Sequence, residues 1–201
     1  AYQVKDVYTV EAAVDFFENH NAANPFCVTV GLMLPHAPYV ASAEDYALYD
    51  GQVGAAPLPA PESEHPWLNW WRKKHDIMEV PEDHAIRART AYYALVTRMD
   101  KMIGEIVDSL EENNLLDNTL IVYSSDHGDQ IGERGLWWKH TFYEESVKIP
   151  LILSWPNKLP KGEHRDQVVN LVDLNATFLE ALNADRLPNS EGRSFLGVAK
   201  D

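Results

Sequence analysis

The chain has 201 residues, of which 45% are hydrophobic and 24% are charged, and these values are typical of a globular protein. Its 17 basic and 31 acidic side chains give a formal net charge of −14, which argues against nucleic acid or an anionic membrane as a partner. The one cysteine, Cys27, excludes an intramolecular disulfide and is expected to be a small buried hydrophobe. No stretch has the length and apolar character of a membrane span.

The N-terminal part of the sequence predicts a helix followed by a buried strand. Residues 9–20 have a capping threonine, an acidic first turn and apolar residues at helical spacing. Residues 24–34, NPFCVTVGLML, form a continuous apolar, partly β-branched run, which is typical of a strand buried on both faces. The polar string PHAPY, residues 35–39, ends this run.

The rest of the chain continues the alternation of helices and strands. Residues 51–66 are rich in Gly, Ala and Pro, and we expect residues 51–80 to form a surface excursion. Further elements are predicted as an amphipathic helix over 82–114, strands at 119–122 and 149–155, and a short helix capped by Asp173. This order predicts an α/β fold, an α/β/α sandwich on a mostly parallel sheet.

Two predicted strand ends carry clusters of polar residues. His36 follows the first strand, and Asp126, His127 and Gly128 follow the second. Ligands of open α/β sheets bind outside the carboxyl ends of the strands. Asp126 and His127 offer an oxygen and a nitrogen to a divalent cation, and Gly128 allows the backbone to turn away at once. Taken alone, however, Asp-His-Gly is better explained by an ordinary turn than by a metal site.

The longer string SDHGDQIGERGLWWK, residues 125–139, together with PHAPY, resembles the type I, formylglycine-dependent sulfatases of the alkaline phosphatase superfamily. The family pattern is an apolar strand, Asp-His/Asn-Gly, a Gly-Glu-x-Gly turn, an aromatic residue and then lysine. The resemblance covers most of residues 24–182 in the same order. Within the family, GERGLWWK is most similar to the branch that includes choline sulfatases and bacterial carbohydrate sulfatases.

The resemblance implies a role for each matching residue. Asp126 and His127 match ligands of a single divalent cation, usually calcium, with magnesium as the alternative. His127 occupies a position at which many family members have asparagine. His36 and Lys139 match the cations that hold the sulfate group, and metal, ammonium and imidazole together suit the charge that develops on a sulfate ester. His36 also has the chemistry to protonate the leaving alcohol.

Three neighbouring side chains, Trp137, Trp138 and His140, are candidates for binding the rest of the substrate. Adjacent tryptophans near a site suit the face of a sugar or a quaternary ammonium group. Taken singly, these residues, His36 and Lys139 are better explained by packing or a solvated surface, and only the joint pattern favours the site. The remaining histidines with no metal-ligand spacing are expected at the surface: His65, His75 and His84.

The sequence lacks the family's nucleophile motif, Cys/Ser-x-Pro/Ala-x-Arg, from which formylglycine is made. We expect that motif upstream of Ala1. Residues 1–201 are therefore expected to be a partial sulfatase catalytic domain, incomplete at both ends and without the family's C-terminal subdomain. Such a chain carries half of the active site and is not expected to be active alone.

The function implied by the resemblance is hydrolysis of a sulfate monoester, on a small molecule or a carbohydrate, to an alcohol and sulfate. Two alternatives stay open. One is a phosphonate monoester or phosphodiester hydrolase of the same superfamily, and the other is a non-catalytic domain that kept the fold. The family implies a periplasmic or secreted setting, with a cytoplasmic one as the alternative, and no feature of the sequence indicates an oligomeric state.

Overall fold

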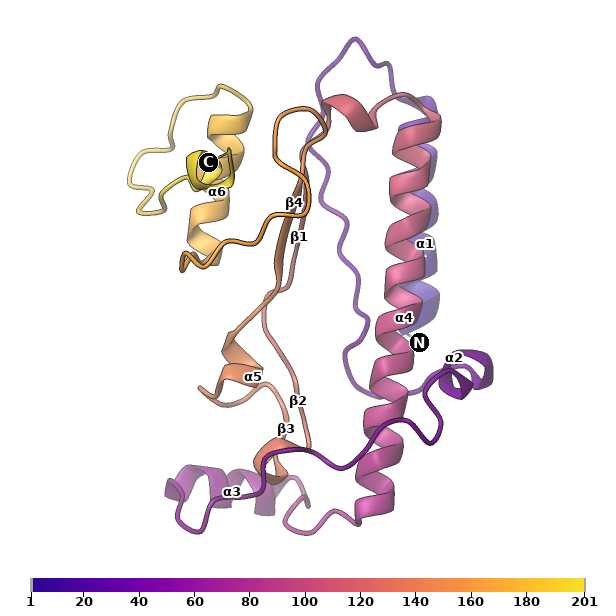
Figure 1. Cartoon of the computed structure of the whole chain (residues 1–201), viewed down its shortest axis with the longest axis vertical. Helices are drawn as coiled ribbons and strands as arrows, with labels where there is room; N and C mark the ends of the chain where they lie inside the picture. The colour runs from indigo at the N-terminus through magenta and orange to yellow at the C-terminus, as the bar shows by residue number, and fades with distance from the viewer. Residues whose placement is uncertain (1, 201) are drawn as a thin grey trace. The chain divides into compact units, whose positions relative to one another are not determined.

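The computed structural model describes residues 2–200, with side chains from Val4 onward, and its helices and strands are labelled in Figure 1. The chain divides into two compact units. The first unit comprises Ala1–Glu112 and His127–Lys148, and the second comprises Asn113–Asp126 and Ile149–Asp201. None of the helices described between residues 2 and 200 is long and apolar enough to cross a bilayer.

Two helices, α1 (Tyr2–Asn19) and α4 (Glu82–Glu112), pack against each other in the first unit (Figure 1). The helix predicted over 82–114 is confirmed in α4, and the one predicted over 9–20 begins earlier, at Tyr2. Their buried apolar side chains include Val10, Ala13, Phe17, Leu95, Met99 and Met102. The short α2 (Ala43–Ala47) is held on α4 by an ion pair between Asp45 and Lys101, at 2.7 Å.

Residues 24–34 are not the buried strand that the apolar pattern predicted. They form no ladder, because the ladders within residues 2–200 join only β1 to β4 and β2 to β3. Cys27 and Val28 are exposed, so the expectation of a buried cysteine was wrong as well. An apolar β-branched run shows that a segment suits a buried strand, but it does not supply the neighbouring strand.

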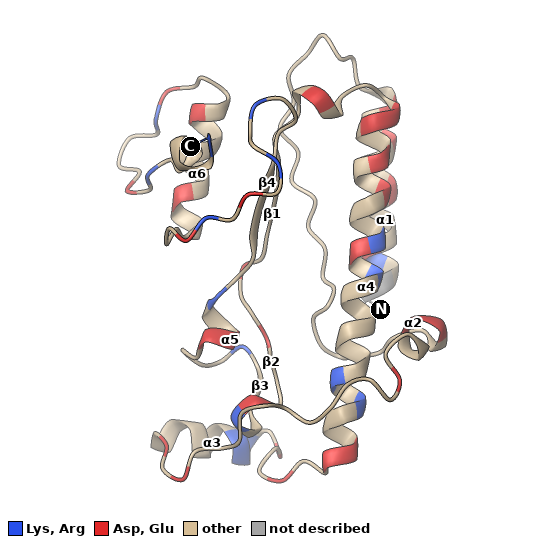
Figure 2. Cartoon of the chain, viewed as in Figure 1, with Lys and Arg blue, Asp and Glu red and all other residues tan. Residues whose placement is uncertain are grey.

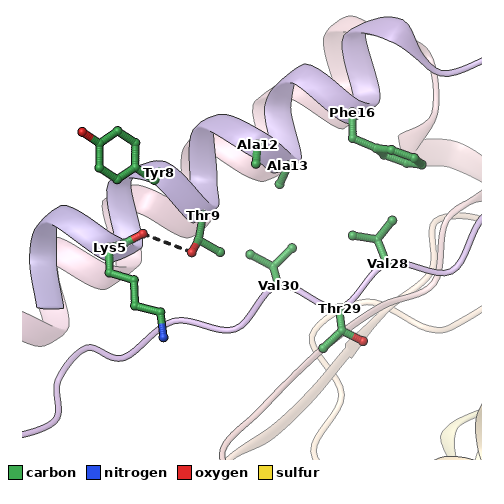
Figure 3. A pocket seen from close by; sticks show the side chains of 9 residues that line it. All are labelled: Lys5, Tyr8, Thr9, Ala12, Ala13, Phe16, Val28, Thr29 and Val30. Atoms are coloured by element: carbon green, nitrogen blue, oxygen red, sulfur yellow. Dashed lines mark hydrogen bonds between the residues drawn. The ribbon is translucent and has the colours of Figure 1, made fainter.

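Beside α1, this extended segment borders a shallow apolar groove of about 480 Å³ (Figure 3). The side chains that line the groove come from α1 and from the extended backbone: Lys5, Tyr8, Thr9, Ala12, Ala13, Phe16, Val28, Thr29 and Val30.

Asp6 of α1 anchors the end of the extended segment. Its side chain is fully buried, and its two oxygens accept the backbone N–H groups of Met33 and Leu34, each at 2.9 Å. A buried carboxylate is stable only when such donors satisfy it. The anchor fixes the chain immediately before His36, which lies between the cis bonds Leu34–Pro35 and Ala37–Pro38.

Helix α3 (Pro66–Lys74) lies within the segment that was expected to be a surface excursion, residues 51–80. It begins after His65, whose ring accepts the N–H of Trp67 at 3.2 Å, and proline occupies its first turn. One face of α3 packs into a core cluster formed by Leu68, Trp71, Ile77, Ile131, Leu136 and Trp137. The Pro-rich composition therefore describes the loop before α3 but not the helix itself.

The Gly-Glu-x-Gly turn forms a short 3-10 helix, η2 (Glu133–Gly135), between strands β2 (Gln130–Ile131) and β3 (Trp137–Trp138). Arg89 of α4 donates to Glu133 at 2.8 Å and to the carbonyl oxygen of Ile131 at 2.9 Å. Arg89 and Glu133 are both buried, with 6% and 8% of their surfaces exposed. Because the charges are paired and also bound to the backbone, the pair holds the turn on α4.

A second arginine, Arg72, joins the same turn to α3. Its guanidinium donates to the carbonyl oxygens of Arg134 and Gly135, and it pairs with Glu64. Gly132 and Gly135 have positive φ angles of 108° and 64°, which glycine adopts without steric cost.

Gly128 lies at a close approach between backbone segments. Its N–H donates to the carbonyl oxygen of Ser146 in α5 (Glu144–Val147), at 2.8 Å. A Cβ atom at position 128 would lie 2.1 Å from the carbonyl oxygen of Glu145, so no other residue fits without a backbone shift.

The second unit contains the antiparallel pair β1 (Ile121–Ser124) and β4 (Leu151–Ser154), close to the two predicted strands. It also contains η1 (Leu116–Asn118), α6 (Leu171–Ala181) and α7 (Leu196–Lys200). The N-cap residue of α6 is Asn170 and not, as the sequence predicted, Asp173. Asp173 is the third residue of the helix, and its side chain accepts the backbone N–H of Asn170, which completes a capping box. The N–H groups of Arg193 and Asn170 lower the pKa of Asp173.

Replacing Arg89 by alanine tests whether the buried pair of Arg89 and Glu133 holds the turn on α4. The change leaves the carboxylate of Glu133 buried without its cation, which typically costs about 3–5 kcal/mol. The matched control Arg87→Ala, on the same helix, removes only an exposed pair with Asp83 at 3.4 Å and is expected to change stability by less than about 0.5 kcal/mol. Urea unfolding followed by tryptophan fluorescence measures both variants, and equal unfolding midpoints would contradict the clamp.

A pair of glycine substitutions tests the close approach at Gly128. Gly128→Ala forces the backbone away from Glu145 and is expected to lower stability by about 1–3 kcal/mol. Gly104→Ala, in α4, has no atom within 4 Å of the new Cβ and is expected to raise stability by about 0.5–1 kcal/mol. Thermal unfolding distinguishes these opposite signs. A Gly128→Ala chain as stable as the parent would show that the turn is not sterically fixed.

Candidate functional site

Two segments that are far apart in the sequence meet in the first unit and bring the predicted site residues together. The hydroxyl of Tyr39 donates to Oδ2 of Asp129 at 3.0 Å, across 90 residues of chain. The ring centroids of His36 and His127 are 6.2 Å apart. The PHAPY loop therefore lies directly against the turn that follows Asp126.

His127 and Lys139 are in direct contact within this cluster. The Nζ atom of Lys139 lies 2.7 Å from Nε2 of His127, and Nδ1 of His127 lies 2.7 Å from the carbonyl oxygen of Gly128. Because a carbonyl oxygen only accepts, the ring proton must be on Nδ1. The Nε2 lone pair of the neutral ring then accepts a hydrogen bond from the ammonium group.

His36 has the same local arrangement. Its Nδ1 atom lies 2.7 Å from the carbonyl oxygen of Ala37, so Nδ1 carries the proton and donates it to that oxygen. Nε2 is then the nitrogen that gains a proton when the ring becomes charged. The cluster thus combines one ammonium group and two imidazoles that are held in a single tautomer by the backbone.

Asp129 offsets the positive charge of this cluster. Burial raises the pKa of its carboxyl group, whereas the hydrogen bond from Tyr39 and the charges of His127, His36 and Lys139 lower it. Burial also raises the pKa of the Tyr39 hydroxyl, and the Asp129 charge adds to that increase. Asp129 therefore lies within electrostatic range of the two predicted cations, His36 and Lys139, and of the predicted metal ligand His127. Sequence analysis gave it no role, although it stands in the motif, two residues after His127.

The two tryptophans of β3 point to different surroundings. Trp137 has 6% of its surface exposed and packs in the core beside Tyr39, which is a structural position rather than the substrate-facing one that we expected. Trp138 is half-buried, and its ring centroid lies 5.5 Å from that of His75. Its φ angle of +67° is costly for a tryptophan, by about 1–2 kcal/mol, and this strain occurs next to Lys139.

His140 lies between the cluster and α3. Its ring centroid is 4.3 Å from that of Trp71. Burial lowers the pKa of His140, and the charges of Lys139, His75, His127 and Lys74 lower it further. His75 was expected at the surface, but it is half-buried, and its ring centroid lies 3.9 Å from that of Trp71. His65 and His84 are exposed, as expected.

The predicted metal ligands have suitable donor chemistry but do not form a complete site. Asp126 is exposed and ends one segment of the second unit, while His127 begins a segment of the first. Within residues 2–200 no group of three or more His, Cys, Asp or Glu side chains is placed to hold a metal ion. The Nδ1–H of His127 is bound to a backbone carbonyl, which is the usual support of a metal-binding histidine. His127 therefore has the backbone support of a metal ligand, and the ligand role of Asp126 stays a prediction.

The chain is similar to known proteins over most of its length. The family model described as Sulfatase matches residues 2–184. The choline-sulfatase of Rhizobium meliloti (strain 1021) is 39% identical over 164 residues, which cover 78% of this chain and 31% of that protein. The chain spans about a third of the length of such curated relatives, with values of 31%, 31% and 37%.

Solved structures match the fold over nearly the whole chain. The phosphonate monoester hydrolase SpPMH from Silicibacter pomeroyi is 26% identical, with a TM-score of 0.82, over 96% of this chain and 41% of that one. The structure of BT4656 in complex with its substrate D-glucosamine-2-N,6-O-disulfate is 21% identical, with a TM-score of 0.80, over 98% of this chain and 52% of that one. These matches confirm the predicted α/β fold of the sulfatase and alkaline phosphatase type. The chain belongs to the sulfatase family.

Proposed function

We propose that this chain carries one wall of the active site of a sulfuric ester hydrolase, which converts a sulfate monoester and water to an alcohol and sulfate. The observation that supports this most directly is the cluster of His36, His127 and Lys139. It joins two sequence segments through the bond from Tyr39 to Asp129, at 3.0 Å. Convergence of ammonium and imidazole groups suits a substrate whose negative charge is spread over several oxygens.

Lys139 is proposed to hold the sulfate group. Its ammonium group has three donors, and in the structure one of them is directed at Nε2 of His127. The remaining donors suit sulfate oxygens. Trp138, with its strained backbone, and the Arg89 and Arg72 clamps fix the loop that carries Lys139, so that the charge is oriented before the substrate arrives.

His36 is proposed to bind the ester oxygen and to protonate the leaving alcohol. Its Nδ1–H bond to Ala37 leaves Nε2 as the atom that carries the transferable proton in the charged ring. The proton would pass from Nε2 to the ester oxygen as the S–O bond breaks, and the ring would return to its neutral tautomer.

Asp126 and His127 are proposed as two ligands of one divalent cation, calcium first and magnesium as the alternative. The carboxylate suits either ion, and the nitrogen is less usual for calcium. A bound cation would withdraw negative charge from the sulfate oxygens. If Nε2 of His127 held the cation, its lone pair would not accept from Lys139, and the ammonium group would be available to the substrate.

The nucleophile is proposed to come from a segment outside these 201 residues. The sequence has no Cys/Ser-x-Pro/Ala-x-Arg string, and the chain matches about a third of its relatives' length. Formylglycine would supply the hydrated aldehyde oxygen that attacks sulfur. We therefore assign activity to the polypeptide in which this chain and that segment fold together.

A phosphonate monoester hydrolase is the second candidate. The match to SpPMH, with a TM-score of 0.82, favours it, because the same cations would suit a phosphonate oxyanion. Rates on a phenyl phosphonate monoester and on the matching phenyl sulfate decide between the two. A non-catalytic domain would hydrolyse neither.

Removing either cation tests the sulfate clamp in the complete enzyme. Lys139→Ala and His36→Ala are each expected to lower kcat by about 100- to 1,000-fold, with a smaller effect on KM. The double variant is expected to lose less than the product of the two, because both groups act on one charge. Steady-state assays with an aryl sulfate measure this. The exposed controls Lys148→Ala and His84→Ala are expected to keep parental rates, and an unimpaired Lys139→Ala enzyme would refute the clamp.

The leaving group tests the acid role of His36 separately. Nitrophenolate leaves without a proton, whereas an alkoxide does not, so His36→Ala should be less damaging on a nitrophenyl sulfate than on an alkyl or sugar sulfate. The ratio of kcat/KM between the two substrates is the measurement. Equal losses on both would restrict His36 to binding the sulfate.

A further inference from the structure

Helix α3 presents two exposed indoles next to the proposed site. Trp67 and Trp70 have 39% and 51% of their surfaces exposed, and their ring centroids are 6.3 Å apart. Lys74 lies over the ring of Trp70, with Nζ 4.8 Å from the centroid. Large adjacent aromatic side chains that remain exposed commonly mark a binding surface. We call Trp67, Trp70 and Lys74 the α3 platform.

Ring stacking and buried hydrogen bonds hold the α3 platform in a fixed orientation. Trp67 stacks on the buried Trp71, with centroids 5.4 Å apart and the ring planes 13° apart. The next residue, Arg72, is buried and bound to the carbonyl oxygens of Arg134 and Gly135. The indoles are therefore oriented before a ligand arrives, which lowers the entropic cost of binding.

Ring contacts connect the platform to the loop that carries Lys139. Trp71 contacts His140 at 4.3 Å, and His75 contacts Trp138 at 5.5 Å. The residues before and after Lys139 thus both pack on α3.

The charge of the platform selects among ligand classes. Helix α3 ends in Arg72, Lys73 and Lys74 and contains no acidic residue (Figure 2). A cation already faces the Trp70 ring, so a quaternary ammonium group would meet repulsion there. A neutral or anionic ring is favoured instead. The apolar C–H face of a sugar suits an indole face, and a sulfate or carboxylate substituent suits a lysine.

We propose that the α3 platform is the subsite for the carbohydrate part of an anionic, multiply sulfated sugar. The sugar ring would stack on Trp67 and Trp70, and a sulfate other than the one cleaved would pair with Lys73 or Lys74. This proposal deepens the proposed sulfatase function, because it names the substrate class of the same site.

Binding to the 201-residue chain tests the platform without any turnover. The six indole N–H signals are followed by NMR while D-glucosamine-2-N,6-O-disulfate is added. The signals of Trp67 and Trp70 are expected to move with one saturable curve, and Trp155 is expected not to move. Trp155 is a matched control because it also carries a lysine over its ring, Lys158 at 4.0 Å. Equal shifts at Trp155, or none at the platform, would overturn the proposal.

Kinetics of the complete enzyme give the second readout. Trp70→Ala and Trp67→Ala are expected to raise KM for the glucosamine disulfate by about 10- to 30-fold with little change in kcat, and Trp155→Ala is expected to change neither. Lys74→Gln should raise KM for the disulfate but not for a nitrophenyl sulfate.

A KM increase confined to choline sulfate would assign the platform to a quaternary ammonium and overturn the proposal. If no sulfate ester is hydrolysed but the indole signals still move, the platform stands and the proposed hydrolysis fails.

Discussion

The hydrogen bond from Tyr39 to Asp129 is the contact on which the site depends. It joins the loop after the extended segment to the turn of the sulfatase motif, 90 residues later, at 3.0 Å. Each side is anchored separately: Asp6 holds the backbone before His36, and Arg89 holds the turn beyond Asp129. Together with the packing of Tyr39 against Tyr92 and Trp137, the bond fixes the position of His36 relative to His127 and Lys139. The cluster therefore forms by tertiary packing of two segments that are each locally rigid.

The proposed site brings positive charge together, whereas the chain as a whole is negatively charged. A formal charge of −14 repels anions at long range, so a sulfate ester needs concentrated local cations. Lys139 provides one such cation and the charged form of His36 would provide a second, and the half-buried Asp129 lies within electrostatic range of both. The Nε2 atom of His127 is involved in both sulfate binding and metal binding as proposed. It accepts a hydrogen bond from the Lys139 ammonium group, and it is also the nitrogen suited to a metal ion. Metal binding and sulfate binding would thus be coupled through one lone pair.

Sequence reasoning predicted the elements that depend on local pattern. The helix at 82–112 follows its 3.6-residue periodicity, and the motif at 126–139 was identified from residue order alone. The sequence did not reveal long-range partners. The apolar run at 24–34 has strand character but forms no ladder within residues 2–200, and helix α3 was hidden by the proline-rich loop before it. The alternation along β3 decides that Trp137 is buried while Trp138 is not, and two residues are too few to show that pattern in a sequence.

The most direct test of the account is the histidine spectrum of the 201-residue chain. Long-range ¹H–¹⁵N spectra of the imidazoles report which nitrogen carries the proton, and nuclear Overhauser effects report which rings are adjacent. We expect protonated Nδ1 atoms in both neutral rings and an Overhauser contact between His36 and His127, whose ring centroids are 6.2 Å apart. Both signatures should weaken in Tyr39→Phe, which loses the bond to Asp129. Rings with the proton on Nε2, or rings with no mutual contact in the parent chain, would contradict the claim that these two segments build one wall of the site.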